Sequence, residues 1–196
     1  MDCRLQAQLD FLIEIDKMKT ILRKTVLIDK SRRENDAEHS WHFALMAIIL
    51  FEYCELEGVN LDRVVKMALV HDLVEIYAGD TFAYDEEGSK DKEARERASA
   101  DKIFSMLPKE QGNEFRLLWE EFDQMKTPDS LYASAIDRFQ PFLNNSVTGG
   151  HTWDKYNVSL PQIYKRMNPV KIATPKLWDF VESTIKKSIE QGYIVY

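Results

Sequence analysis

Apolar residues recur at intervals of three and four along most of the chain, which is the spacing of one face of an amphipathic helix. The clearest example runs from Leu61 to about Ala78, where Gly79 ends the pattern. Other segments with this spacing or with helix-start residues are 5–22, 39–56, 93–107, 109–125, 128–145 and 175–191. The pattern predicts an all-α protein, a bundle of about six or seven helices.

Short polar residues mark where several of these helices begin. Asn35 is followed three positions later by Glu38, as in a capping box, in which each side chain binds the other residue's backbone amide. Asn60 precedes the segment that starts at Leu61. Thr127 and Thr174 each stand before a proline, a residue that fits the first turn of a helix. Each of these positions predicts a helix start.

Strand-like and loop-like segments are few. Only 25–28 and 193–196 look extended, and 27–33, 80–90 and 148–157 look like loops. Seven glycines in 196 residues are few for a chain rich in tight β-turns. Because no repeat, low-complexity tract or linker interrupts the pattern, we expect the whole chain to form one domain.

Composition narrows the classes of function. The net charge of −7 argues against broad binding to nucleic acid polymers or to anionic membranes. The longest uncharged apolar run, 43–51, is shorter than the roughly 20 residues that cross a bilayer. Nothing at the start resembles a secretion signal, so we expect a cytoplasmic protein. Cys3 and Cys54 are too few for a disulfide framework and are expected to be reduced thiols.

Three polar residues, His71, Asp72 and Glu75, interrupt the apolar segment 61–78. At about 100° per residue, a continuous helix would place all three side chains in one quadrant of its surface. Two carboxylates and an imidazole are costly to bury together unless a cation or a hydrogen-bond network compensates them. The cluster therefore predicts a cation site or a polar network.

His39 and Asp137 interrupt two other apolar helix faces. Together with His71 and Asp72 they would give two imidazole nitrogens and two carboxylate oxygens, a set that suits one divalent Mn, Fe, Co, Ni or Zn ion. Each residue also has a simpler interpretation, His39 as a histidine near a helix start and Asp137 as an acid paired with Arg138. The coincidence of all four favours the metal site.

The order His39, His71-Asp72 and Asp137 resembles that of the HD-domain phosphohydrolases. Three motifs are similar to those of the 5′-deoxynucleotidase branch, which includes YfbR-like and HD-domain-containing protein 2-like proteins: ENDAEHS at 34–40, HDLVE at 71–75 and AGD at 78–80. The resemblance implies one HD domain over 1–196, with a core over about 8–145 and C-terminal helices over 146–196.

The resemblance also implies a ligand set and an assembly. His39, His71, Asp72 and Asp137 would hold one divalent transition metal ion, with cobalt or manganese preferred. The working form would be a homodimer, and its partner would be a small-molecule nucleotide substrate. These expectations come from the family and not from the spacing of the residues.

The reaction implied by the resemblance is removal of the 5′-phosphate from (deoxy)ribonucleoside 5′-monophosphates by a metal-activated water. Glu75 would orient this water or take its proton, and Arg23 would neutralise the phosphate. Asp80 would accept a hydrogen bond from the sugar 3′-hydroxyl. Lys24 stands where the family has an aromatic residue that is thought to favour 2′-deoxy sugars, so deoxyribose selectivity is not implied for this chain.

Two other functions stay open on the sequence. An HD-type site also serves hydrolases of other nucleotides, such as a dNTP, (p)ppGpp or a cyclic nucleotide, and a non-catalytic metal- or nucleotide-binding protein would keep the same ligands. The chain has neither a P-loop nor a Gly-x-Ser-x-Gly motif, which argues against a P-loop NTPase and a serine hydrolase. Trp119, Phe122 and Met125 share a helix face and are expected in the core or a dimer interface.

The remaining histidines and two arginines have weaker claims to function. His42 lies one turn beyond His39, and His151 lies in a predicted loop, so ordinary packed or exposed histidines are expected at both positions. Arg32 and Arg33 precede the His39 helix and would either add positive charge near a phosphate or remain solvated.

Overall fold

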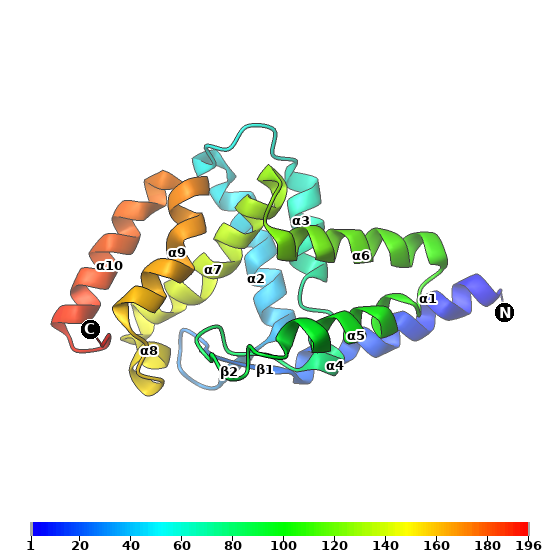
Figure 1. Cartoon of the computed structure of the whole chain (residues 1–196), viewed down its shortest axis with the longest axis horizontal. Helices are drawn as coiled ribbons and strands as arrows, with labels where there is room; N and C mark the ends of the chain where they lie inside the picture. Colours follow the sequence, from blue (N-terminus) through cyan, green and yellow to red (C-terminus); the bar gives the residue numbers. More distant parts are fainter. Residues whose placement is uncertain (1, 196) are drawn as a thin grey trace.

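The computed structural model describes residues 2–195 and is almost entirely helical (Figure 1). The α-helices are α1 (Cys3–Glu14), α2 (Asp36–Ile49), α3 (Leu61–Val70), α4 (Glu75–Ala78), α5 (Lys92–Phe104), α6 (Lys109–Gln124), α7 (Pro128–Thr148), α8 (His151–Lys155), α9 (Leu160–Ala173) and α10 (Trp178–Glu190). Strands β1 (Leu22–Val26) and β2 (Arg33–Asn35) form one small antiparallel sheet. The predicted all-α class is confirmed.

Two apolar clusters hold these helices together. The larger one lies among α2, α3, α7, α9 and α10, while the smaller one lies among α1, α5 and α6, on the other side of the molecule (Figure 1). Helix α3 passes from one cluster to the other, because Met67 belongs to the larger and Val70 to the smaller. His71 and Asp72 follow directly, so they lie where the two clusters meet.

Three of the four predicted capping residues, Asn35, Asn60 and Thr127, cap the helices that follow them. The prediction is wrong for Thr174, whose side chain donates to the Val170 carbonyl and which precedes a short 3₁₀-helix over Pro175–Leu177. The Glu38 amide donates to Asn35 Oδ1 at 2.9 Å, and the Asn35 amide donates to Glu38 Oε2 at 3.2 Å, which completes the capping box of α2. The Thr127 side chain accepts from the Ser130 amide at 3.1 Å at the start of α7. These local hydrogen bonds form within three residues, and for that reason they could be predicted from the sequence.

The predicted helix over 61–78 is wrong in one respect, because it breaks in the middle. Helix α3 ends at Val70 and α4 begins at Glu75. Between them the Leu73 amide donates to the Val70 carbonyl at 3.1 Å, and the Glu75 amide donates to the Asp72 carbonyl at 2.9 Å. These bonds span three residues instead of four, so the chain is wound more tightly at His71 and Asp72 than an α-helix.

The predicted helices 5–22 and 39–56 also end earlier than expected. Helix α1 ends at Glu14 and continues as a 3₁₀-helix over Ile15–Thr20, after which the chain enters β1. Helix α2 ends at Ile49 and continues as a 3₁₀-helix over Leu50–Tyr53. Strand β1 contains the first two residues of the predicted extended segment 25–28. The three residues of β2 have no strand-like composition, and this strand was not predicted.

The C-terminal part contains helices, as the family resemblance implies, but more of them than the hydrophobic pattern alone predicted. Helix α8 lies within the predicted loop 148–157, and α9 was not predicted although Ser159 and Gln162 form a capping box at its start. Of the predicted extended segment 193–196, Val195 pairs with Ser159 in an isolated bridge, and Tyr196 lies outside the described residues. Among residues 2–195, no helix has the length and apolar character needed to cross a membrane.

Candidate metal centre

Side chains from three parts of the chain converge at the junction of the two clusters. His39 Nε2, from α2, lies 3.0 Å from Oδ1 of Asp137, from α7. His71 Nε2 lies 3.0 Å from Asp72 Oδ1 and 3.7 Å from Asp137 Oδ1. All four residues are buried. The structure therefore brings together the four residues that the sequence predicted as metal ligands.

The four residues fit a divalent transition metal ion. Ligand atoms at about 2.1 Å from one ion lie roughly 3.0–3.4 Å from each other, and the closest nitrogen–oxygen pairs here lie 3.0 Å apart. Nε2 of His71 is buried and makes no hydrogen bond, as expected of a nitrogen that is reserved for a ligand. Two imidazole nitrogens and two carboxylate oxygens are a donor set for Mn, Fe, Co, Ni or Zn.

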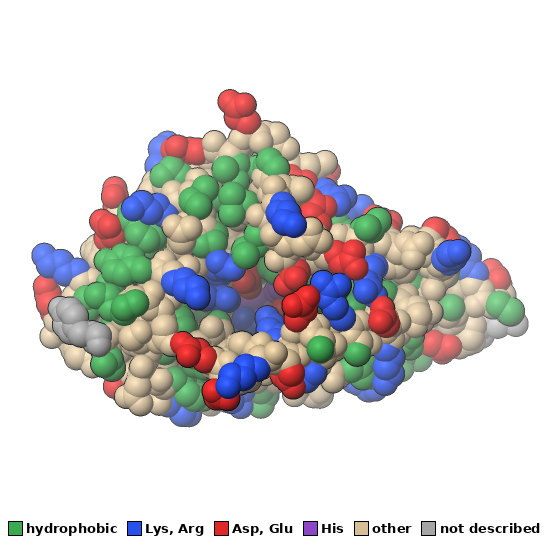
Figure 2. Space-filling model, in the orientation of Figure 1, with side chains coloured by type: hydrophobic (Ala, Val, Ile, Leu, Met, Phe, Trp, Pro, Cys, Tyr) green, Lys and Arg blue, Asp and Glu red, His purple; other side chains and the backbone are tan. Residues whose placement is uncertain are grey.

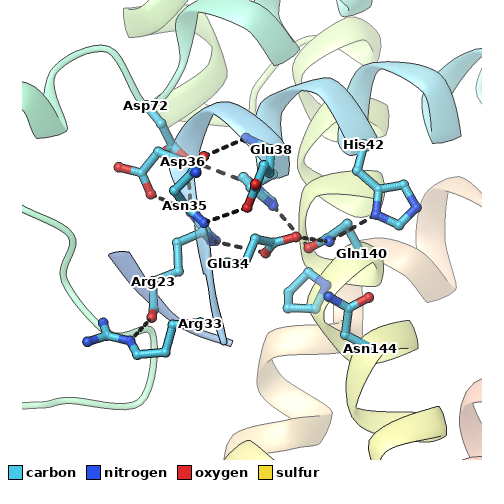
Figure 3. A network of polar contacts seen from close by, with 12 residues as sticks. Arg23, Arg33, Glu34, Asn35, Asp36, Glu38, His42, Asp72, Gln140 and Asn144 are labelled. Atoms are coloured by element: carbon cyan, nitrogen blue, oxygen red, sulfur yellow. Dashed lines mark hydrogen bonds and ion pairs between the residues drawn. The ribbon is translucent and has the colours of Figure 1, made fainter. Parts of the chain in front are cut away.

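The other ring nitrogen of each histidine faces an oxygen. His39 Nδ1 lies 3.0 Å from Gln140 Oε1, and His71 Nδ1 lies 3.0 Å from the Ala68 carbonyl. The Gln140 amide group donates to Glu34 Oε1 at 2.7 Å, which fixes its orientation in the network of Figure 3. Nδ1 of both rings is thus the donor, and the lone pair of Nε2 faces the centre. Gln140, which was not predicted from the sequence, is fully buried and lies one turn after Asp137 on α7.

Each carboxylate of the centre also faces an arginine. Asp72 Oδ2 accepts a hydrogen bond from Arg23 Nη1 at 2.9 Å, and Asp137 Oδ2 lies 3.5 Å from Arg166 Nη2. The other oxygen of each carboxylate faces a histidine nitrogen. Arg166 could not be predicted as part of the site because α9, which carries it, was itself not predicted. The alternative pairing of Asp137 with Arg138 is wrong, since Arg166 occupies that role.

The histidines and carboxylates of the centre stabilise each other's charged forms. Burial lowers the pKa of His71, but the Asp72 and Asp137 carboxylates outweigh burial and raise it to about 10. Burial raises the pKa of Asp137, but the neighbouring His39 and His71 imidazoles and the Arg166 guanidinium outweigh burial and hold the pKa well below its usual range. The carboxylates that favour a proton on His71 also favour a divalent cation in its place.

A second group of acids adjoins the centre. Carboxylate oxygens of Asp36, Glu75 and Asp80 lie within 4.8 Å of one another. Burial raises the pKa of Glu75 well above its usual value, and the Asp72 and Asp36 carboxylates add to the shift. Burial, with the Asp72 carboxylate, likewise raises the pKa of Asp36 to about 7. A divalent cation nearby would favour the ionised form of Glu75, which a proton acceptor requires.

A cavity of about 200 Å³ opens onto these residues, and Glu75, Asp80, Arg23 and Lys24 are among its lining side chains. In Figure 2 a hollow lies near the middle of the displayed face, with basic and acidic side chains around it. Phe122 and Met125 also line the cavity, whereas Trp119 lies in the apolar core. The expected core position is therefore confirmed for Trp119 and for Phe122, which packs against the larger cluster, whereas Met125 is exposed.

Arg32, Arg33 and His42, which had weaker claims to function, make contacts that stabilise the local structure. Arg32 forms an ion pair with Glu38, and Arg33 donates to the backbone carbonyls of Arg23 and Leu22. His42 Nδ1 lies 3.2 Å from Gln140 Nε2, on the outer side of the network in Figure 3.

His151 is the first residue of α8.

Arg23 lies beside the acidic group. Its burial lowers the pKa of the guanidinium, but the Asp72 and Glu75 carboxylates outweigh burial and raise this pKa above its usual value. Arg23 is therefore a permanent cation at the edge of the acidic group.

A family model described as HD domain matches residues 15–178 of the chain. The human protein named 5′-deoxynucleotidase HDDC2 is 28% identical over 139 residues, which are 70% of this chain and 66% of the human protein. The match thus spans just under two thirds of that relative. The Dictyostelium discoideum protein of the same name is 30% identical over 141 residues, 69% of this chain and 74% of that protein.

Solved structures show the same likeness. A predicted metal-dependent phosphohydrolase from Magnetospirillum magnetotacticum MS-1 is 45% identical, with a TM-score of 0.93 over 98% of this chain and 96% of that one. The PH0347 protein from Pyrococcus horikoshii OT3 has a TM-score of 0.63 at 21% identity, over 90% of this chain and 97% of that one. The second likeness is one of fold alone.

Proposed function

Because this chain belongs to the HD-domain family, we propose that it is a metal-dependent phosphohydrolase that removes the 5′-phosphate from (deoxy)ribonucleoside 5′-monophosphates. The observation that carries the proposal is the convergence of His39, His71, Asp72 and Asp137. The last three of these residues line one cavity together with the buried Glu75. The names of the human and Dictyostelium relatives support the substrate class.

His39, His71, Asp72 and Asp137 would hold the ion. When bound there, a divalent metal supplies a Lewis acid that makes water a nucleophile at neutral pH and withdraws charge from a phosphate oxygen. Glu75 takes the proton of the attacking water and gives it to the 5′-oxygen as that oxygen leaves. Water adds to phosphorus, the bond from phosphorus to the 5′-oxygen breaks, and the nucleoside leaves as an alcohol with inorganic phosphate as the other product.

Arg23 and the sugar-facing residues complete the proposed site. Arg23 stabilises the negative charge of the phosphoryl group while its Nη1 remains bonded to Asp72. Asp80, which lines the cavity, accepts a hydrogen bond from the 3′-hydroxyl of the sugar. Lys24 lines the cavity, with Nζ 6.0 Å from the centre of the Tyr156 ring, and its long, flexible side chain would exclude a ribose 2′-hydroxyl poorly.

We also propose a homodimer that works in the cytoplasm, as the family resemblance implies. Trp41, Leu45 and Ile48 support a protein interface, because they form one exposed apolar stripe along α2, with 64%, 40% and 50% of their surface exposed. Light scattering of the purified protein should give twice the chain mass, and Trp41→Glu should lower that mass. A monomeric wild-type protein at micromolar concentration would contradict the dimer.

The proposed reaction is tested by phosphate release from AMP and dAMP with the protein loaded with Co²⁺ or Mn²⁺. Release is expected with both metals, and it should stop after chelation of the metal and return on its addition. Asp10→Asn, an exposed change on α1, is the matched control and should keep full activity. A metal-loaded protein that hydrolyses none of the nucleoside 5′-monophosphates would contradict the proposal.

A further inference from the structure

Arg138 is a cation of the cavity that lacks an acidic partner. Among residues 2–195, no carboxylate oxygen lies within 4.0 Å of its guanidinium nitrogens. Its two polar contacts are Nη2 with Met125 Sδ at 3.0 Å and Nη1 with the Arg166 carbonyl at 3.4 Å. Nε is buried and has no partner. A guanidinium has five N–H donors, so most of the donors of Arg138 are unused.

The other two arginines of the cavity differ from Arg138 in this respect. Arg23 donates to Asp72 at 2.9 Å and lies 3.7 Å from Asp36. Arg166 lies 3.5 Å from Asp137. Their charges are balanced by carboxylates of the metal centre or of the adjoining acidic group, and both arginines hold those carboxylates in place. Among the described residues, Arg138 has no carboxylate within 4.0 Å, so it can bind an anion without giving up an ion pair.

A mostly buried cation without a counter-ion is costly unless an anion binds to it. Arg138 follows the predicted ligand Asp137 directly on α7 and lines the same cavity as His71 and Glu75. An anion that enters the cavity and reaches the centre would therefore meet Arg138. The planar, forked donors of a guanidinium match the oxygens of a phosphate.

We propose that Arg138 binds a phosphate group of the substrate, on the Asp137 side of the centre, while Arg23 lies on the Asp72 side. That this phosphate belongs to a nucleotide rests on the proposed function, whereas the anion site itself does not. Arg166 acts as a positioning residue for Asp137 and leaves the phosphate to Arg138.

Calorimetric binding of inorganic phosphate to the metal-loaded protein tests the proposal without any turnover. Arg138→Gln should weaken phosphate binding at least about tenfold, the usual scale for a lost charge-assisted hydrogen bond, while the metal content stays unchanged. Arg138→Lys, which keeps the charge but not the fork, should bind with intermediate affinity. Arg97→Gln is the matched control, because Arg97 lies on the surface of α5 in an ion pair with Glu93.

Methylenediphosphonate, which cannot be hydrolysed, distinguishes which phosphate Arg138 contacts. A loss of affinity for both ligands in Arg138→Gln places the phosphate nearest the ion against Arg138, and a loss for methylenediphosphonate alone places a second phosphate there. Wild-type affinity for both ligands, in folded and metal-loaded Arg138→Gln and Arg138→Lys, would overturn the proposal. If the variants lose phosphate affinity but the wild type hydrolyses no nucleotide, the anion site stands and the proposed function fails.

Discussion

Gln140 holds His39 across the core: Gln140 Oε1 lies 3.0 Å from His39 Nδ1, although the two residues are 101 positions apart in the chain. Both side chains are fully buried, so neither can exchange this contact for water. The pair fixes which nitrogen of His39 carries the proton and aims the other at Asp137 and His71.

Gln140→Leu should therefore weaken metal binding although Gln140 is not a ligand. We expect a loss of roughly 10–100-fold in metal affinity, the range found when a partner of a ligating histidine is removed. Competition with a fluorescent chelator measures it. Leu143→Ala, a change on the same helix away from the network, serves as the control, and equal affinities in wild type and Gln140→Leu would show that His39 needs no such support.

Asp72→Ala and Glu75→Ala should separate metal binding from catalysis. Asp72→Ala removes an anionic ligand and leaves Arg23 without its partner, so metal and activity should be lost together. Glu75→Ala should keep the metal and lose about 10²–10⁴-fold in kcat, the usual contribution of a general acid or base. Metal analysis and phosphate release on the same samples check both. Wild-type turnover in Glu75→Ala would show that another group takes the proton.

The sugar preference should be weak. Lys24 is long and flexible, so it excludes a ribose 2′-hydroxyl poorly and can donate a hydrogen bond to it. We expect kcat/KM for AMP and dAMP to differ by less than about 100-fold, or under about 2.7 kcal/mol. A nucleoside 3′-monophosphate should be a poor substrate, because Asp80 would then face a phosphate instead of a hydroxyl. A preference for dAMP far above 100-fold would mean that another residue excludes the 2′-hydroxyl.

Asp36 should make the stability of the metal-free protein fall as pH rises. Burial, with Asp72, raises its pKa in the folded protein to about 7, so the folded state binds the proton more tightly than the unfolded state does. The resulting stabilisation is complete below about pH 4, the ordinary pKa of an aspartate, and is lost as pH rises to about 7.

Asp36→Asn carries no titrating proton and should escape this loss. Compared with wild type, its free energy of unfolding in urea should therefore be relatively higher at pH 8 than at pH 4. The exposed Asp10→Asn is the control and should show little such change. A wild-type difference from Asp36→Asn that stays constant between pH 4 and pH 8 would contradict the raised pKa.

Gly112 allows α6 to approach the end of α5 closely. A Cβ at this position would overlap the backbone carbonyl oxygen of Phe104, which cannot move without shifting α5. Alanine is favoured over glycine in a helix by about 1 kcal/mol, but the overlap costs about 1–3 kcal/mol. Gly112→Ala should therefore lower the melting temperature, whereas the neighbouring exposed Asn113→Ala should leave it unchanged or raise it. An equal or higher melting temperature for Gly112→Ala would show that α5 yields.

The helix starts and the residue types of the centre could be predicted from the sequence alone. The capping box of Asn35 and Glu38 closes within four residues, and its geometry needs no other part of the protein. His39, His71, Asp72 and Asp137 were identified because ionisable side chains interrupt apolar helix faces, where their burial requires compensation.

The tertiary structure alone decided the contacts that join distant parts of the chain. Gln140 against His39, Arg166 against Asp137 and the tight turn at His71 each depend on which helix faces which. An isolated segment carries no information about these partners, because a polar side chain on an apolar face satisfies its hydrogen bonds with whatever the packing brings to it. Local hydrogen bonds and hydrophobic periodicity therefore determined the helices, and the packing of α2, α7 and α9 determined how the centre is held.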